Sequence, residues 1–205
     1  MIERGSKSPL GAFLQPDAWS GGHYELAILL CNRDDIRAFA VMKHLWSFPL
    51  IDGPYGFRDR EPAMQPKAYP DLGTRQYGLA TISNGIVVPC GSAFTRSDDG
   101  SDWVQLYFPM GSISGWFPTA GFPFNPSSQK QVWKEELDTW LIGLARHVFA
   151  SNAFQLALVG FEVELGRFSR AQIQENGLPE QRLDGVMLPL NGSLEWLPPS
   201  PPAQT

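Results

Sequence analysis

Cysteine, basic runs and long apolar stretches are scarce or missing in this sequence, and each absence excludes a class of protein. Cys31 and Cys90 are the only cysteines, too few for a disulfide framework or for a zinc site built from cysteines. Only 18% of the 205 residues are charged, the formal net charge is −5, and lysine and arginine form no cluster. We therefore expect neither nucleic acid nor a membrane surface as a partner, because both require a basic surface.

Targeting and anchoring patterns are also missing. No stretch approaches the roughly 18 apolar residues of a membrane-spanning helix, and the N-terminal residues lack the apolar core of a secretory signal. We therefore expect a cytoplasmic protein whose two cysteines remain thiols. Residues 1–14 and 198–205 contain small residues, polar residues and proline without periodicity. This composition predicts two flexible tails around a single domain of residues 15–197.

Apolar residues make up 43% of the chain, enough for a packed core, and their spacing favours an α+β domain. A spacing near 3.6 predicts two amphipathic helices. The first is capped by Asp34 or Asp35 and ends before Pro49, and the second runs from about Ser128 to Asn152. Strands are predicted at residues 23–30, 77–82, 86–95, 103–108 and 154–161, followed by a weak helix at 169–176 and a hairpin at 185–197.

This order of main elements, βαβββαβ, is related to the ferredoxin-like arrangement, with one additional strand in the middle. In that arrangement two helices cover one face of an antiparallel sheet. Residues 23–30 and 154–161 are the most continuously apolar strands, so we expect them at the centre of the sheet. The long loops, the terminal hairpin or a second subunit must then cover the other face, because a wide apolar face is seldom left exposed.

Glycine and proline together number 38, and much of this excess falls in two long segments without periodicity. The first comprises residues 50–76, where four prolines exclude a long helix or strand. Most of this segment, the loop 53–75, is a candidate for binding a partner. In this loop, Arg58 and Arg60 alternate with acidic residues. In extended backbone both arginines point to the same side, where they can grip a carboxylate or phosphate. Alternatively, they form ion pairs with the body of the protein and hold the loop in place.

The second irregular segment comprises residues 109–128 and is strongly aromatic. Its large rings either cover the open face of the sheet or form a patch that binds a partner. The candidate binding residues in this segment are Trp116, Phe117, Phe122 and Phe124.

Residues able to carry out catalysis are few and scattered. Cys90 is a candidate nucleophile if a histidine or lysine lowers the pKa of its thiol, although a buried structural cysteine is the commoner case. Glu162 and Glu164 can present paired carboxylates at the end of a strand. The histidines, His23 among them, lie far apart without metal-ligand spacing, so we expect neither a metal site nor a cofactor.

Three functional hypotheses follow. The first is a non-enzymatic protein-binding module, in one version inhibitory or immunity-type, that binds a partner or itself through the loops 53–75 and 109–128. The second is a small cysteine-dependent hydrolase or transferase with Cys90 as its nucleophile. The third is a small-molecule-binding domain that uses the uncovered face of the sheet as its pocket.

Overall fold

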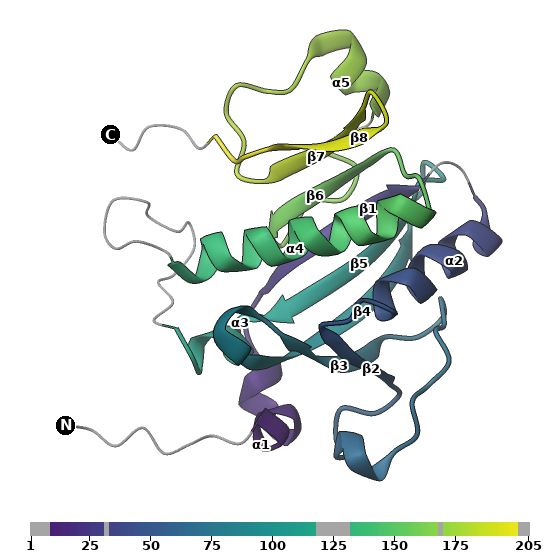
Figure 1. Cartoon of the computed structure of the whole chain (residues 1–205). Coiled ribbons are helices and arrows are strands. Elements are labelled where there is room, and N and C mark those ends of the chain that lie inside the picture. Colours follow the sequence, from purple (N-terminus) through teal and green to yellow (C-terminus); the bar gives the residue numbers. More distant parts are fainter. Residues whose placement is uncertain (1–8, 31–32, 118–131, 168–169, 201–205) are drawn as a thin grey trace.

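The computed structural model describes residues 9–30, 33–117, 132–167 and 170–200 (Figure 1). These residues form a sheet with helices on both sides. In chain order, with η for 3-10 helices, the elements are α1 (Pro9–Leu14), η1 (Pro16–Trp19), β1 (His23–Leu30), α2 (Asp35–Trp46), β2 (Ile51–Tyr55), η2 (Pro62–Met64), β3 (Gln76–Thr81), η3 (Ser83–Gly85), β4 (Val87–Arg96), β5 (Asp102–Pro109), α3 (Met110–Ser114), α4 (Val132–Ser151), β6 (Leu156–Phe161), α5 (Arg170–Asn176), β7 (Gly185–Leu190) and β8 (Ser193–Leu197).

The eight strands form one sheet in the order β2-β3-β4-β5-β1-β6-β7-β8. Every neighbouring pair is antiparallel. Strand β1 lies inside the sheet, where it pairs with β5 on one side and with β6 on the other. The most apolar strands, β1 and β6, therefore lie side by side near the centre, as the sequence predicts.

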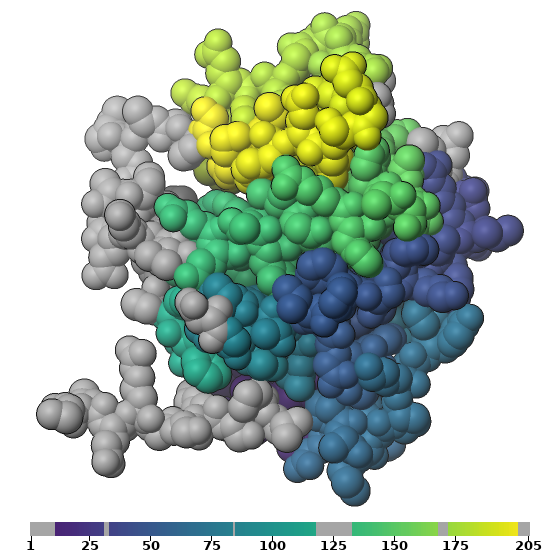
Figure 2. All heavy atoms as spheres, in the orientation of Figure 1, coloured from purple at the N-terminus to yellow at the C-terminus, as the bar shows by residue number. Residues whose placement is uncertain are grey.

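Helices α2 and α4 lie together on one face of the sheet and bury the main core beneath them (Figure 1). Alternate residues of β1, including Tyr24, Leu26 and Ile28, point toward these helices. Helix α2 begins as the sequence predicts, because the Asp34 carboxylate accepts a hydrogen bond from the Arg37 N–H at 3.0 Å. On this side, α2, α4 and the hairpin β7–β8 form a continuous surface (Figure 2). Among the described residues, no helix has both the length and the apolar character needed to span a membrane.

The second face of the sheet is covered at its two ends by different segments. At the β2–β4 end, the N-terminal segment buries Phe13 against Tyr55 and Leu79. At the other end, side chains between Val163 and Leu178, including those of α5, pack over β1, β5, β6 and β7. The terminal hairpin covers neither end, because it is itself part of the sheet. Among the described residues, no such apolar cover lies over the part of this face around His23, Glu25 and Tyr107.

The fold is α+β and antiparallel as predicted, but the strand order does not confirm the ferredoxin-like topology. Two features of the sheet differ from the prediction. Residues 51–55, predicted to be irregular, form the edge strand β2, and the terminal hairpin extends the sheet beyond β6. An edge strand has few ladder hydrogen bonds to lose, so it tolerates Gly53 and Pro54, and its register with β3 shifts between Asp52 and Tyr55.

The segments predicted to be tails and irregular regions also contain structure. Residues 9–14, part of the predicted N-terminal tail, form α1, and Phe13 is fully buried. Near the C-terminus, Ser200 forms a bridge with Arg182. Residues 110–114 of the predicted aromatic loop form α3. The predicted cap Ser128 lies outside the described residues.

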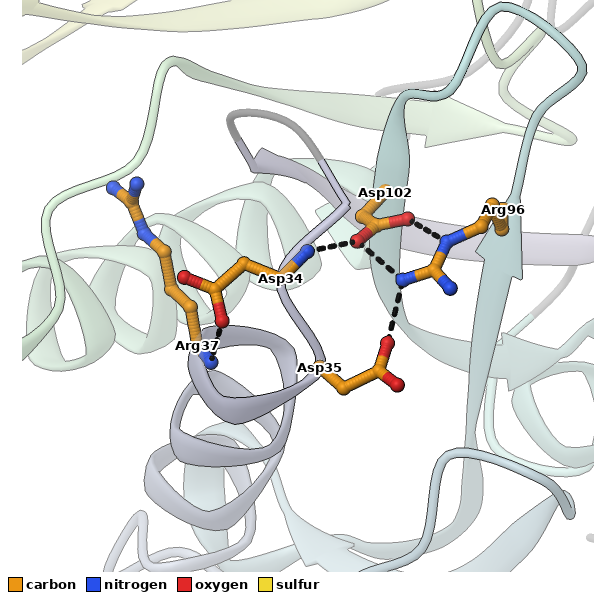
Figure 3. A network of polar contacts seen from close by, with 5 residues as sticks. All are labelled: Asp34, Asp35, Arg37, Arg96 and Asp102. Carbon is orange, nitrogen blue, oxygen red and sulfur yellow. Dashed lines mark hydrogen bonds and ion pairs between the residues drawn. The ribbon is translucent and has the colours of Figure 1, made fainter.

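A buried carboxylate joins the start of α2 to the hairpin β4–β5 (Figure 3). Asp102 has no exposed surface and accepts three hydrogen bonds, from the Asp34 N–H at 3.2 Å and from Arg96 Nε and Nη2 at 2.6 and 2.8 Å. Arg96 Nη2 also donates to Asp35 at 2.6 Å. The hydrogen bonds from Arg96 hold the pKa of Asp102 below its usual range. The ionised carboxylate therefore stabilises this corner of the fold.

Replacing Asp102 by asparagine tests this network. Asp102→Asn removes the charge that Arg96 and the start of α2 share, so we expect a loss of about 2 kcal/mol in the free energy of unfolding at pH 7, measured with urea. Because the folded-state pKa is lowered, this stabilisation is present above the unfolded pKa near 3.9 and is lost as pH falls through the folded value. The difference between the proteins should therefore shrink below pH 4. Asp98→Asn, an exposed change in the same hairpin, is the control; an equal loss there would contradict the assignment.

Candidate functional site

Arg58 and Arg60 lie in the loop 53–75 with their side chains exposed. The guanidinium carbon of Arg60 is 4.1 Å from the ring centroid of Phe57. Gln65 holds this part of the loop through three hydrogen bonds of 2.8 to 3.1 Å to the backbone of Phe57 and Arg60. Within the described residues, neither arginine forms an ion pair with the body of the protein. Anion binding by Arg58 and Arg60 stays a prediction.

The described part of the aromatic segment packs on the core. Trp116 and Phe117 are half-buried against the main core cluster, and their backbone N–H groups donate to the Ile113 carbonyl at 2.9 and 3.0 Å. Phe122 and Phe124 lie outside the described residues. Trp116 and Phe117 thus contribute to the cover of the core, and partner binding by the segment stays a prediction.

Cys90 lies on the helix-facing side of β4 and has no exposed surface. Burial raises the pKa of its thiol well above the ordinary value, with a smaller contribution from Asp52. A nucleophilic cysteine needs an accessible thiolate, so this environment does not support the cysteine-dependent hypothesis. Cys31 lies outside the described residues.

A polar pocket of about 290 Å³ opens on the second face of the sheet, in the part without an apolar cover. Its walls come from the three strands β1, β4 and β5, from the residue before β3 and from the turn after β6. The lining residues are His23, Glu25, Arg75, Ala93, Thr95, Gln105, Tyr107, Glu162 and Val163.

Strand alternation and register bring these side chains together. In β1, every second residue points away from the helices, which places His23 and Glu25 on the pocket side. Tyr107 of β5 lies directly opposite Glu25, and Gln105 lies opposite Ala93 of β4. Cross-strand partners point to the same face, so one stretch of sheet carries an acid, an amide and a phenol next to one another.

Two glycines in the same cross-strand row make room for larger side chains. Gly91 lies opposite Tyr107, and a Cβ at Gly91 would come within 2.5 Å of the tyrosine ring and hydroxyl. Gly160 lies opposite Glu25, and a Cβ there would come within 2.1 Å of Asp184 Oδ1. Tyr107 therefore leans over β4 and Asp184 leans over β6, on either side of Glu25.

Glu25 forms the floor of the pocket and is only 6% exposed. Its Oε1 accepts a hydrogen bond from the Val163 N–H at 2.9 Å, and its Oε2 accepts one from Gln105 Nε2 at 3.1 Å. Thr95 Oγ1 donates to Gln105 Oε1 at 3.1 Å and so orients the amide. Burial raises the pKa of Glu25 to about 7 although both hydrogen bonds lower it, and Glu162 contributes a further rise. Glu25 therefore changes its charge near neutral pH.

His23 and Tyr107 form a ring pair at the side of the pocket, with centroids 4.6 Å apart. Burial and the positive charge of Arg75 lower the pKa of His23, while Glu162 opposes the shift. Burial raises the pKa of Tyr107 to about 12. At neutral pH the pocket thus contains a neutral imidazole and a phenol that keeps its proton.

Arg75 and Glu162 are exposed charged groups of the lining. Glu162 has a positive φ of 45°, which is uncommon for a residue with a side chain. Its own N–H donates to the His23 carbonyl at 2.8 Å, and the next N–H, that of Val163, reaches Glu25. This backbone conformation ends β6 while supplying a hydrogen bond to the pocket floor.

The predicted pair Glu162 and Glu164 is only partly brought together. Both line a smaller adjoining pocket of about 200 Å³ with Asp184, but only Glu162 also lines the larger pocket. Among the histidines, His44 and His147 lie on α2 and α4 with ring centroids 6.5 Å apart, on the opposite side of the sheet from His23.

Sequence reasoning missed Glu25, Arg75, Gln105 and Tyr107 as site residues. One signal for Glu25 was present: within HYELAILL, His23 and Glu25 are the two polar residues and share one face of the strand. A polar pair on a central strand indicates a polar region on that face. No local signal marks Arg75, because its position depends on the path of the preceding loop.

Replacing Glu25 by glutamine tests its environment. The folded protein binds the Glu25 proton more tightly than the unfolded chain does. Ionising Glu25 between pH 4.5 and about 7 therefore lowers the wild-type free energy of unfolding, by about 3 kcal/mol in total. Glu25→Gln avoids this loss, so urea unfolding should favour the variant increasingly as pH rises through this range.

The matched control is Glu195→Gln, which removes an exposed carboxyl group of β8. Its stability should follow the wild-type curve across the same pH range. A Glu25→Gln curve that stays parallel to the wild-type curve would show that folding does not raise the pKa of Glu25 and would contradict its assigned environment.

Comparisons with known proteins identify no relative of this chain: no protein-family model, no curated protein and no solved structure matches it. Neither a family nor a structural neighbour therefore indicates an activity. The function is inferred from the pocket itself, that is, from its position on the sheet, its buried acid and the charges in its lining.

Proposed function

We propose that this protein is a small-molecule-binding domain and that the polar pocket on the second face of its sheet is the binding site. The observation that supports this proposal is the nearly buried Glu25 at the floor of an open pocket. A carboxyl group whose pKa is raised by burial costs the folded protein stability at neutral pH, where an apolar residue would cost none. Such groups are concentrated at functional sites.

The size of the pocket limits the ligand. A volume of about 290 Å³ is at the lower end of the range for ligand sites. At about 30 Å³ for each water-sized group, it holds roughly ten non-hydrogen atoms. The ligand is therefore the size of a simple metabolite rather than a nucleotide or a peptide.

The scaffold suits recognition of such a molecule. Glu25, Gln105 and Tyr107 extend from paired strands in the interior of the sheet, so their backbone positions are fixed. Thr95 orients Gln105, which in turn donates to Glu25, so these polar groups are aligned before a ligand arrives. Preorganised polar groups reduce the entropic cost of binding.

Filling the pocket tests the proposal. Ala93 is a half-buried residue of the lining, and Ala93→Trp should fill much of the space without removing a polar group. Small polar metabolites that bind wild type can be found by ligand-observed NMR screening. We expect their affinity for this variant to be at least tenfold weaker.

The control for this screen is Ala63→Trp, which places the same side chain at an exposed position of the loop 53–75. It should bind like wild type. Ligands that bind Ala93→Trp as tightly as wild type, in a variant shown by circular dichroism to be folded, would place the site elsewhere and refute the proposal.

A second candidate function is the protein-binding module, in its inhibitory or immunity-type form or as a self-associating protein. The observation that favours it is a group of exposed apolar side chains in the loop 53–75: Phe57 is 51% exposed, Met64 78% and Tyr69 74%. Exposed apolar side chains gathered in one loop are typical of interaction surfaces.

Charge substitution tests this second candidate. If wild type retains a partner from host lysate, or self-associates in sedimentation velocity, Met64→Asp should abolish that binding. The substitution places a charge in the apolar contact. Ile36→Asp, at an equally exposed apolar residue of α2, is the control. Retention that survives Met64→Asp, or that is lost equally with Ile36→Asp, would count against the loop as the interface.

A further inference from the structure

We propose that the ligand of this pocket is a small zwitterion, whose ammonium group lies against Glu25 and whose carboxylate pairs with Arg75. This inference rests on the proposed function, since it assigns a ligand class to the same site. Its basis is the distribution of charge and of unused hydrogen-bonding capacity around the pocket.

The floor and the β6 side of the pocket favour a cation. Glu25 and Glu162 line it, and Asp184 and Glu164 lie in the adjoining pocket that shares Glu162. Glu162 and Asp184 both make ionisation of Glu25 less favourable, so their charges act on the same small volume. An ammonium group at this position would relieve the repulsion among the carboxylates and favour the ionised form of Glu25.

Glu25 has hydrogen-bonding capacity left for a ligand. A carboxylate has about four acceptor sites, and Glu25 uses one on each oxygen, for Val163 and for Gln105. Its remaining lone pairs belong to a side chain that is 94% buried and lines the pocket. An ammonium donor is the natural partner for such an acceptor, because it supplies both charge and hydrogen bonds.

Arg75 supplies the opposite charge. Its side chain is exposed, and within the described chain no carboxylate forms an ion pair with it. Its positive charge lowers the pKa of both His23 and Tyr107, which places the guanidinium near the ring pair. A ligand carboxylate can therefore meet an unpaired guanidinium with two parallel hydrogen bonds.

The remaining groups of the lining are compatible with the neutral part of such a ligand. His23 is neutral at pH 7, Tyr107 keeps its proton, and Ala93 presents a methyl group. The pocket thus offers the acidic Glu25 for an ammonium group, the basic Arg75 for a carboxylate, and neutral groups besides. This combination matches a molecule that carries one charge of each sign. Amino acids and related amino carboxylates of up to about ten non-hydrogen atoms belong to this class and fit the volume.

Binding of an ammonium group should depend on pH through Glu25. The groups that act on Glu25 are Gln105 of β5, Val163 and Glu162 after β6, and Asp184 before β7. The other titratable groups of the pocket lining are His23 of β1, Tyr107 of β5 and Arg75 before β3. Because burial raises the pKa of Glu25 to about 7, the ligand must displace a proton at lower pH. We expect affinity about tenfold weaker at pH 6 than at pH 8, with proton release at pH 6.

Calorimetry with matched probes tests the ligand class. The panel consists of the common amino acids, β-alanine and 4-aminobutyrate, each with the amine that lacks its carboxylate and the carboxylate that lacks its amino group. For 4-aminobutyrate these matched probes are propylamine and butyrate. We expect at least one zwitterion to bind ten or more times tighter than its matched amine and its matched carboxylate. Glu25→Gln and Arg75→Gln should each weaken the binding of that zwitterion at least tenfold. Glu25→Gln should also abolish the pH dependence of its affinity.

The control variant is Arg146→Gln, which removes an exposed positive charge from α4 on the opposite side of the sheet and should change nothing. A matched amine that binds as well as the zwitterion, or a zwitterion unaffected by Arg75→Gln, would overturn the ligand assignment. If no zwitterion binds while other metabolites bind and are excluded by Ala93→Trp, the ligand class is wrong and the proposed function stands. If nothing binds wild type, both fail.

Discussion

The antiparallel pairing of β1 with β5 and β6 is the constraint on which the rest of the structure depends. Because β1 is paired on both edges, its side chains can only alternate between the two faces of the sheet. Tyr24, Leu26 and Ile28 build the core beneath the helices, while His23 and Glu25 project from the other face. A shift of one residue in register would turn His23 and Glu25 toward the helices and would turn the core residues of β1 toward the second face. The same strand pairing therefore specifies both the core and the pocket.

The pocket also depends on how the second face is covered. Two segments from opposite ends of the chain cover the two ends of this face, one around Phe13 and one running from Val163 to Leu178. Apart from Val163 at the edge of one cover, neither extends over the pocket around Glu25. Val163 belongs to one of these covers and also donates its N–H to Glu25, so the edge of an apolar cover is part of the polar site. A single continuous cover would have removed the pocket, and no cover would have left too much apolar surface exposed.

The sequence was informative where a local pattern determines the structure. Asp34 caps α2, and the Asn191-Gly192 turn joins β7 and β8 with positive φ at both residues. It was less informative where tertiary contacts decide. Pro54 and Gly53 argued against a strand, yet an edge position accepts them. Glu25 was visible as a polar residue in an apolar run, but its partners Gln105 and Val163 lie far away in the sequence. Only the pairing of β1 with β5 and β6 brings them to Glu25.

The edge strand β2 has a further consequence for how copies of this protein meet. A free sheet edge is a template on which another chain can add a strand, and long unprotected edges lead to aggregation. At this edge, Pro54 has no N–H to offer, and its carbonyl already accepts a hydrogen bond from the Ala68 N–H at 2.7 Å, while Lys67 pairs with Asp52 at 3.0 Å. The loop after β2 thus folds back over the strand that precedes it. Besides any role in recognition, this loop protects the sheet against extension by a neighbouring molecule.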